Sequence, residues 1–275
     1  TGVQTCALPI CQTGPYRRRA GINLIIEAFS GALSVTGEPD RPAVRIGPSA
    51  IDFTTGAHGA IGILAALSEA QKSGKGQVVD TAMVDGTAIL MSMFWGMAQS
   101  GVYDENKPGT NLLDTGAHFY DAYRTKDGKY VSFGSIEPQF YAEMLQKLGL
   151  EGDAEFARQM DKSAWPALKE RMRAIIATKT RSEWNALMEM SDVCYAPVLT
   201  MSEAAKHPHN VARKAFLDID GVVQPAPAPR FSRTMPATPT TGAFPGQNSR
   251  DILVGWGIPA SEADALIAKG AVKQA

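Results

Sequence analysis

The chain has 275 residues, 44% of them hydrophobic and 20% charged, which is typical of a globular protein with room for one or two domains. Its formal net charge is −1, so no basic face is implied and nucleic-acid binding has no electrostatic support. The three cysteines argue against a disulfide scaffold and favour a reducing compartment, so we expect a cytoplasmic protein.

Metal and membrane sites also lack support in the sequence. His207 and His209 stand in a turn-like KHPHN segment without thiols or carboxylates around them, and no CxxC or HExxH pattern occurs, so we expect no metal. The most apolar stretch, residues 57–67, is too short to cross a bilayer, and no secretory signal is visible. We therefore expect no membrane partner.

The first ten residues, TGVQTCALPI, show neither a helical nor a strand period. They resemble the in-frame translation of a sequencing-library adapter, and such scars are excluded from fold reasoning. We expect residues 1–18 to be a non-native or disordered head, and the natural chain to join in mid-protein between Cys11 and Arg19, without its own N-terminus.

The next stretch predicts helices around one short strand. Residues 22–33 suit a buried helix or a helix–strand junction, and residues 58–70 suit a helix after an N-cap at Thr54 or Thr55. Gly74 is expected just beyond that helix, and Val78-Val79 resume as a strand. The expected buried face of the second helix consists of Ile61, Leu64, Ala65 and Leu67.

Residues 81–99 predict a further helix that is apolar almost all round. A helix without a polar face is buried in a core or a subunit interface, and its methionines are best explained as core filling. The polar, Gly- and Pro-containing segment 101–111 follows, and we place a domain boundary there.

The following residues predict a small α+β domain. Residues 119–133 alternate apolar and polar side chains around a tight turn at Asp127-Gly128, which is typical of a hairpin. Thr180 and Glu183 have the spacing of a capping box at the start of a helix. The other expected elements are helices at 138–148, 165–178 and 181–190 and a strand at 195–199.

The last part of the chain begins with a proline-rich segment. Residues 224–246 predict extended chain laid over a surface. Short helices at 249–254 and 261–268 follow, and we expect their apolar faces to dock on the first domain.

Asp52 is the strongest candidate for chemistry. It is a lone carboxylate between Ile51 and Phe53, just before a Thr-Thr-Gly turn that opens a helix. Carboxylates act as nucleophiles toward activated acyl groups, and oriented N–H donors assist them. On residue type and spacing alone, a helix cap is the simpler explanation of Asp52.

Other polar residues have structural explanations too. Glu137 precedes Pro138 at a helix start, where acids occur as dipole partners. His58 and His118 are more simply packing or hydrogen-bonding residues than catalysts. The glycines form neither a GxGxxG nor a Walker pattern.

Several long motifs change this balance, because they resemble class III CoA-transferases, the CaiB/BaiF family. The segments GEPDRP, IDFTTG, GILAAL and SGKGQVVDTAMVDG carry the resemblance to the family. AMVDGTAILMSMFWGM, GAHFYDAYRTKDGKYVSFGSIEPQFY, DVCYAPVLTMSEAAKHPHN and VVQPAPAPRFSRT are closest to its α-methylacyl-CoA racemase branch.

The resemblance implies an α/β fold: a Rossmann-like CoA-binding domain, incomplete here, plus a small α+β domain. Two such chains would interlock as a homodimer like linked rings. We accordingly assign residues 19–105 to the large domain, 106–200 to the small domain and 201–275 to a segment that returns to the large domain.

The resemblance also implies roles for particular residues. Asp52 matches the family's catalytic aspartate, which attacks an acyl-CoA thioester in transferases and works opposite a histidine in racemases. By family position, Ala20, Gly21, Ile22 and Asn23 would contact CoA, which is a substrate here and not a permanent cofactor. The racemase histidine position is Ile22, which cannot exchange protons, whereas the matching glutamate, Glu137, is retained.

The sequence therefore predicts a CoA-transferase that moves CoA between carboxylic acids through Asp52. An α-methylacyl-CoA racemase is the first alternative. A non-catalytic remnant that dimerises without holding CoA is the second.

Overall fold

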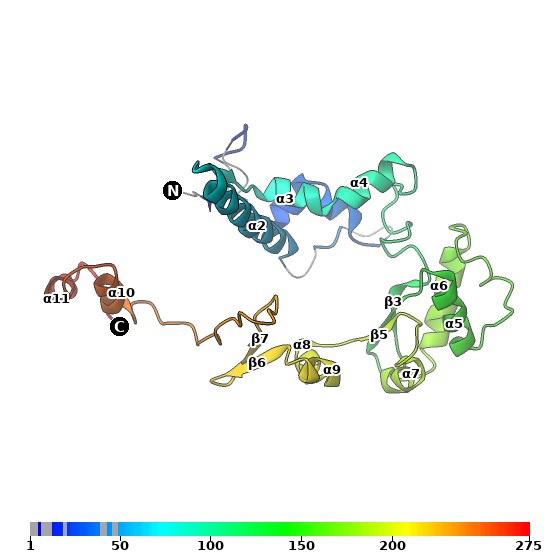
Figure 1. Ribbon diagram of the computed structural model, residues 1–275. Helices are drawn as coiled ribbons and strands as arrows, with labels where there is room; N and C mark the ends of the chain where they lie inside the picture. Colours follow the sequence, from blue (N-terminus) through cyan, green and yellow to red (C-terminus); the bar gives the residue numbers. More distant parts are fainter. Residues whose placement is uncertain (1–4, 7–12, 19–20, 39–42, 46–48) are drawn as a thin grey trace. The chain divides into compact units, whose positions relative to one another are not determined.

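The computed structural model describes residues 5–6, 13–18, 21–38, 43–45 and 49–275 (Figure 1). Ala20 and most of the predicted head lie outside these residues. The chain forms two compact units, Thr1–Val198 and Leu199–Ala275, and the boundary predicted between residues 105 and 106 lies within the first.

The first unit opens with helices. Residues 22–33 form a helix and a turn at Gly31, whose φ is 83°, so the alternative of a helix–strand junction is wrong. A short parallel pair joins Thr5–Cys6 (β1) to Val79–Asp80 (β2). The helical elements are α1 (Asn23–Phe29), a 3₁₀ helix (Ala32–Val35), α2 (Ala50–Ser73), α3 (Met83–Leu90) and α4 (Ser92–Gln99).

Helix α2 begins at Ala50, earlier than the predicted start at residue 58. The face expected to be buried is wrong as well, because Ile61, Leu64, Ala65 and Leu67 are all exposed. The face of α2 that packs against its neighbours is instead a stripe at helical spacing, made mostly of small residues. We call this the small-residue stripe; its members are Ile51, Thr55, Gly59, Gly62 and Ala66.

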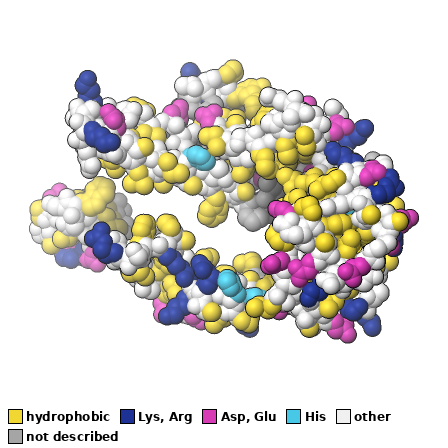
Figure 2. Space-filling model, turned by 45° about the vertical axis from the view of Figure 1, so that its right-hand side comes forward, with side chains coloured by type: hydrophobic (Ala, Val, Ile, Leu, Met, Phe, Trp, Pro, Cys, Tyr) yellow, Lys and Arg dark blue, Asp and Glu magenta, His cyan; other side chains and the backbone are white. Residues whose placement is uncertain are grey.

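This stripe allows neighbouring elements to approach the α2 backbone closely. A Cβ on Gly62 would lie 2.9 Å from Cγ1 of Val79 in β2, a separation that real Cβ atoms do not show. The opposite face of α2 carries large apolar side chains that the described chain leaves uncovered. Figure 2 shows hydrophobic side chains of this kind spread over the molecular surface.

Helix α2 has 24 residues, so the prediction from residues 57–67 underestimates its length. By length and composition alone it could cross a membrane. A core helix of a soluble protein passes the same test of length and composition.

The single helix predicted over residues 81–99 and its burial in a core are wrong, whereas its burial in a subunit interface stays a prediction. The chain breaks at Met91 between α3 and α4, and no residue of α4 is buried. Met93 and Trp95 are about half exposed, so these side chains do not fill a core within the described residues. Within α3, Gly86 and Thr87 are buried, and Met83 is partly buried against the Ile26–Ile51 contact.

The helices and strands predicted for the α+β part are confirmed. Strands β3 (Tyr120–Arg124), β4 (Tyr130–Gly134) and β5 (Tyr195–Val198) form an antiparallel sheet in the order β3-β4-β5. The hairpin turn places Gly128 at a φ of 76°, and Thr180 with Glu183 forms the expected capping box. The helices are α5 (Pro138–Leu148), α6 (Trp165–Ile176) and α7 (Arg181–Met188).

An aromatic and aliphatic core joins this sheet to its helices. Phe119, Val131, Met144, Met172 and Trp184 are all fully or almost fully buried within it. The core is therefore a sheet face covered by amphipathic helices, as the alternation and the helical spacing predict.

The second unit contains more structure than the sequence suggested. Helices α8 (Met201–Lys206) and α9 (Pro208–Ala212) and the hairpin of β6 (Phe216–Ile219) and β7 (Val222–Pro225) were not expected. Residues 226–248 form neither helix nor strand, in line with the predicted extended segment. The unit ends with α10 (Ser249–Gly255) and α11 (Ala260–Ala268), which pack on each other.

His118 occupies the core as a neutral imidazole. Its Nε2 lies 2.8 Å from the Tyr141 hydroxyl, which itself donates to the Phe156 carbonyl, so Nε2 carries the proton and donates. Nδ1 is buried and has no hydrogen-bond partner in the described part of the chain. Burial, together with the smaller effect of the Lys169 charge, lowers the pKa of His118 to about 4.

This histidine should make stability depend on pH. Its pKa falls from 6.5 in the unfolded chain to about 4 in the folded protein, so the unfolded state binds the proton first as pH falls. Stability is then full above pH 6.5 and lower by roughly 2 kcal/mol at pH 5. The glutamine of His118→Gln does not titrate. We therefore expect the urea midpoint of this variant to change less between pH 7.5 and pH 5 than that of the unaltered protein. Parallel pH profiles of the two proteins would contradict this.

Candidate active site

Asp52 lies in the first turn of α2, two residues inside the helix start at Ala50. Ser49 is the N-cap, so Asp52 does not cap the helix in the way the sequence suggested. Its side chain is exposed, and no hydrogen bond or ion pair joins it to any other residue that the structure describes. The carboxylate is therefore unpaired within the described residues, and it lies where a helix N-terminus favours negative charge.

The position of this carboxylate depends on how α2 is held. Ile51, next to Asp52, packs against Ile26 of α1 and Met83 of α3. One turn further along, Thr55 lies against Gly86 of α3, where an added Cβ would be 2.5 Å from Oγ1 and 3.1 Å from Cα of Thr55. Helices α2 and α3 can approach this closely only because residue 86 is glycine.

Gly86→Ala should therefore push the two helices apart. We expect it to lower the free energy of unfolding by about 1–3 kcal/mol, as overpacking does. The matched control is Gly96→Ala in α4, where nothing lies within 4 Å of the added Cβ. That variant should gain up to about 1 kcal/mol from helix propensity. Equal denaturation midpoints for the two variants would refute the close-packing argument.

The residues matched to the CoA contacts lie at the start of α1. Ile22 is the N-cap residue and is 68% exposed, and Gly21 before it is half-buried. Asn23 is buried, and its amide donates to Oε1 of Glu27 over 2.5 Å. The Ile26–Ile51 contact lies one turn beyond Ile22, so the starts of α1 and α2 meet at one packed contact.

Three buried polar atoms around these helices have no hydrogen-bond partner among the residues that the structure describes: Oδ1 of Asn23, Oε2 of Glu27 and Oγ1 of Thr55. Glu27 is fully buried. Such groups are normally hydrogen-bonded, so this part of the site retains unused bonding capacity.

Glu137 is the N-cap residue of α5. Its side chain is exposed and makes no capping hydrogen bond. Burial raises the pKa of the Cys194 thiol, and the negative charges of Glu137 and Asp192 raise it further. Glu137 therefore acts electrostatically on Cys194, at the start of β5.

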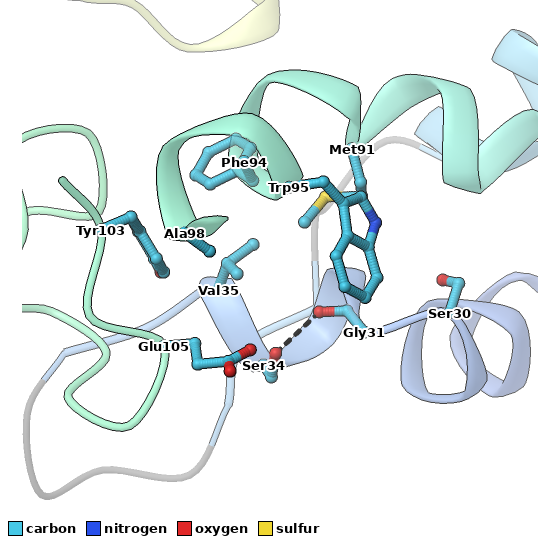
Figure 3. A pocket seen from close by; sticks show the side chains of 10 residues that line it. All are labelled: Ser30, Gly31, Ser34, Val35, Met91, Phe94, Trp95, Ala98, Tyr103 and Glu105. Carbon is cyan, nitrogen blue, oxygen red and sulfur yellow. Dashed lines mark hydrogen bonds between the residues drawn. The ribbon is translucent and has the colours of Figure 1, made fainter. Parts of the chain in front are cut away.

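A small cavity of about 60 Å³ separates the 3₁₀ helix from α4 (Figure 3). Phe94, Trp95 and Val35 point toward it, and Ser34 donates to the Gly31 carbonyl at its edge. Because ligand sites usually have about 300–1,000 Å³, this cavity is too small for an acyl-CoA.

The structure thus brings the Ile22 and Asp52 helix starts together, but no hydrogen bond or ion pair between described residues joins Asp52 to Glu137. The sequence reasoning missed the buried ion pair of Lys169 and Asp121, whose Nζ and Oδ2 lie 2.7 Å apart. Nothing local marks it, because its partners come from α6 and β3. Within the described residues, no three His, Cys, Asp or Glu side chains form a group that could hold a metal ion.

Comparison with known proteins gives this geometry a context. The family described as CoA-transferase family III matches residues 11–248. An alpha-methylacyl-CoA racemase of Mus musculus is 39% identical over 91% of this chain, and a succinyl-CoA–D-citramalate CoA-transferase of Chloroflexus aurantiacus is 31% identical over 88%. This chain spans 66% and 62% of the lengths of these two relatives.

A solved structure shares the fold. The CAIB/BAIF family protein from Brucella suis aligns with a TM-score of 0.76 and 23% identity, covering 92% of this chain and 67% of that one. The mixed α/β fold expected from the sequence is therefore confirmed.

Proposed function

We propose, on the premise that this chain belongs to CoA-transferase family III, that it moves CoA between carboxylic acids with Asp52 as the nucleophile. The observation that carries the proposal is the exposed, unpartnered carboxylate at the N-terminus of α2, held by the packing of Ile51 and Thr55. Its substrates would be an acyl-CoA and a free carboxylic acid, and Gly21, Ile22 and Asn23 would contact the CoA.

The reaction would begin when Asp52 attacks the thioester carbonyl of the donor. The C–S bond breaks, CoA leaves as thiolate, and a mixed anhydride joins the acyl group to Asp52. The thiolate then attacks the Asp52 carbonyl, which releases the first carboxylate and leaves an aspartyl-CoA thioester. The acceptor carboxylate attacks that thioester, and the returning thiolate takes the new acyl group and frees Asp52.

The protein's contribution is positional and electrostatic. The N-terminus of α2 favours negative charge near Asp52, and such fixed dipoles stabilise the charge that develops on a thioester oxygen under attack. No metal ion is needed for these steps, because every bond change is an acyl transfer between oxygen and sulfur.

Racemisation is the second candidate, and the higher identity to the racemase favours it. That reaction needs two groups that exchange a proton on opposite faces of the α-carbon. Ile22 occupies the matched histidine position at the start of α1 and carries only hydrocarbon. Transfer requires no such partner, and we therefore prefer it.

Asp52→Asn should abolish transfer, because an amide cannot form the anhydride, and should leave the urea midpoint unchanged since the side chain is exposed and unpaired. In the unaltered protein, hydroxylamine or borohydride added during turnover should convert Asp52 to a product that peptide mass spectrometry detects. Asp85→Asn, on α3, is the control. Turnover by Asp52→Asn, or no adduct during turnover, would contradict the nucleophile assignment.

The competing reaction has its own readout. A 2-methylacyl-CoA incubated in D₂O should take up no deuterium at its α-carbon if the protein is only a transferase. Exchange at the rate of epimerisation, followed by NMR and mass spectrometry, would favour the racemase. Absence of CoA binding in calorimetry would favour the non-catalytic remnant.

The interlocked homodimer remains part of this proposal. The large apolar side chains of α2 that face away from the small-residue stripe support it, since water-exposed apolar surface of this extent favours association. Light scattering on the purified protein measures its oligomeric state directly.

A further inference from the structure

The sheet of the α+β part has an open edge along β3. The strand order β3-β4-β5 gives β3 a neighbour on one side only, among the residues that the structure describes. The Thr125 amide donates to the Lys129 carbonyl, so Thr125 and every second residue before it bond toward β4. Residues in between point their N–H and C=O groups the other way, which places those of Ala122 and Arg124 at the open edge.

Most of these outward groups have no partner. The Ala122 amide donates to Oδ1 of its neighbour Asp121 over 2.7 Å. The Ala122 carbonyl and the Arg124 amide form no hydrogen bond within the described part of the chain. Unpaired backbone groups in a row are a template on which a further strand can pair.

A groove of about 570 Å³ lies beside this edge. Its lining includes every residue from 121 to 126 and Tyr130 of β4, and Arg173 and Ala177 at the end of α6 line it as well. The volume is within the range of binding sites. The open edge therefore faces a space that a ligand can enter.

The hairpin turn at the end of the groove is held in place. The Thr125 hydroxyl donates to Oδ1 of Asp127 over 2.6 Å, and the same oxygen accepts from the Arg181 amide over 3.0 Å. The Lys126 amide donates to the Lys179 carbonyl over 2.9 Å. Because these bonds fix the turn on the chain between α6 and α7, the groove is preformed and a ligand need not order it.

Three basic side chains line the groove. Arg124 and Lys126 form no ion pair with any described residue, and a guanidinium nitrogen of Arg124 lies 3.4 Å from where a Cβ on Gly128 would stand. The Arg124 charge is therefore close to the hairpin turn. Arg173 forms an exposed ion pair with Glu170.

The groove also has acidic lining residues. Asp121 pairs with Lys169 over 2.7 Å, and Glu38 is the other carboxylate. With the pairs of Asp121 and Arg173 set aside, Arg124 and Lys126 face one carboxylate, so the remaining charge of the lining is positive. Positive charge of this kind favours an acidic partner and disfavours a basic one.

We propose that this groove binds an extended, acidic segment of another polypeptide, which adds a strand to the open edge of β3. The segment's main chain pairs with Ala122 and Arg124, and its carboxylates lie near Arg124 and Lys126. In this mode of recognition the main-chain bonds give affinity and the side chains give specificity. A small anion would use the basic side chains and leave the backbone groups unpaired. The site is independent of the proposed function.

The charge preference is tested by fluorescence anisotropy with the whole protein and two labelled peptides. One is a short peptide of alternating valine and glutamate, and the other has lysine in place of glutamate. The glutamate peptide should bind at least roughly tenfold more tightly, and Arg124→Glu should weaken its binding at least roughly tenfold. Arg233→Glu, in the extended segment of the second unit, is the matched control and should bind like the unaltered protein.

The strand pairing is tested by hydrogen exchange followed by NMR. In the complex, the Arg124 amide should exchange at least roughly tenfold more slowly, whereas the Tyr123 amide, which already faces β4, should change little. Ala122→Pro should weaken binding and keep the β3–β4 ladder, because residue 122 points its N–H away from β4.

Charge-dependent binding without slower exchange at Arg124 would overturn strand addition in favour of a contact with the side chains alone. Equal binding of the two peptides, or of Arg124→Glu and the unaltered protein, would overturn the assignment of an acidic partner. Absence of binding by the glutamate peptide would overturn the whole proposal, and each of these outcomes leaves the role of Asp52 untouched.

Discussion

The close approach of α2 to α3 is the contact on which the candidate site depends. Thr55 lies against the backbone of Gly86 in α3. Gly62, another member of the small-residue stripe, faces Val79 in β2. Small residues let backbones approach where large ones cannot. The position of the helix that carries Asp52 therefore depends on the small size of the residues in the stripe as well as on its side-chain contacts. The Ile26–Ile51 contact then fixes the start of α1 beside the start of α2.

The α+β part is held by a different kind of contact. Lys169 reaches from α6 to Asp121 on β3 and to the carbonyl of Thr115 in the preceding loop. Removing either partner of such a buried pair leaves an uncompensated charge. One ion pair thus couples a helix, a strand and the loop in which Thr115 has a φ of 75°.

Local chemistry made part of this structure predictable. Asp127-Gly128 specified the hairpin, and Thr180 with Glu183 specified the start of α7, because a turn and a capping box are formed by neighbours in sequence. Thr200 and Glu203 carry the same capping signal for α8, which the sequence analysis overlooked. The start of α2 was misplaced because Thr54-Thr55-Gly56 suits a turn in isolation, whereas burial of Ile51 and Thr55 against two other helices favours helix. The Lys169–Asp121 pair could not be predicted, since its residues meet only in the folded chain.

The uncovered side of α2 has a thermodynamic consequence. Phe53, Ile61 and Leu64 are each more than 60% exposed, and transfer of such side chains out of water is among the largest favourable terms in folding. Any surface that covers them binds the folded form and not the unfolded one, so its concentration enters the folding equilibrium by mass action. With such a surface present, the melting temperature would depend on the concentration of that surface.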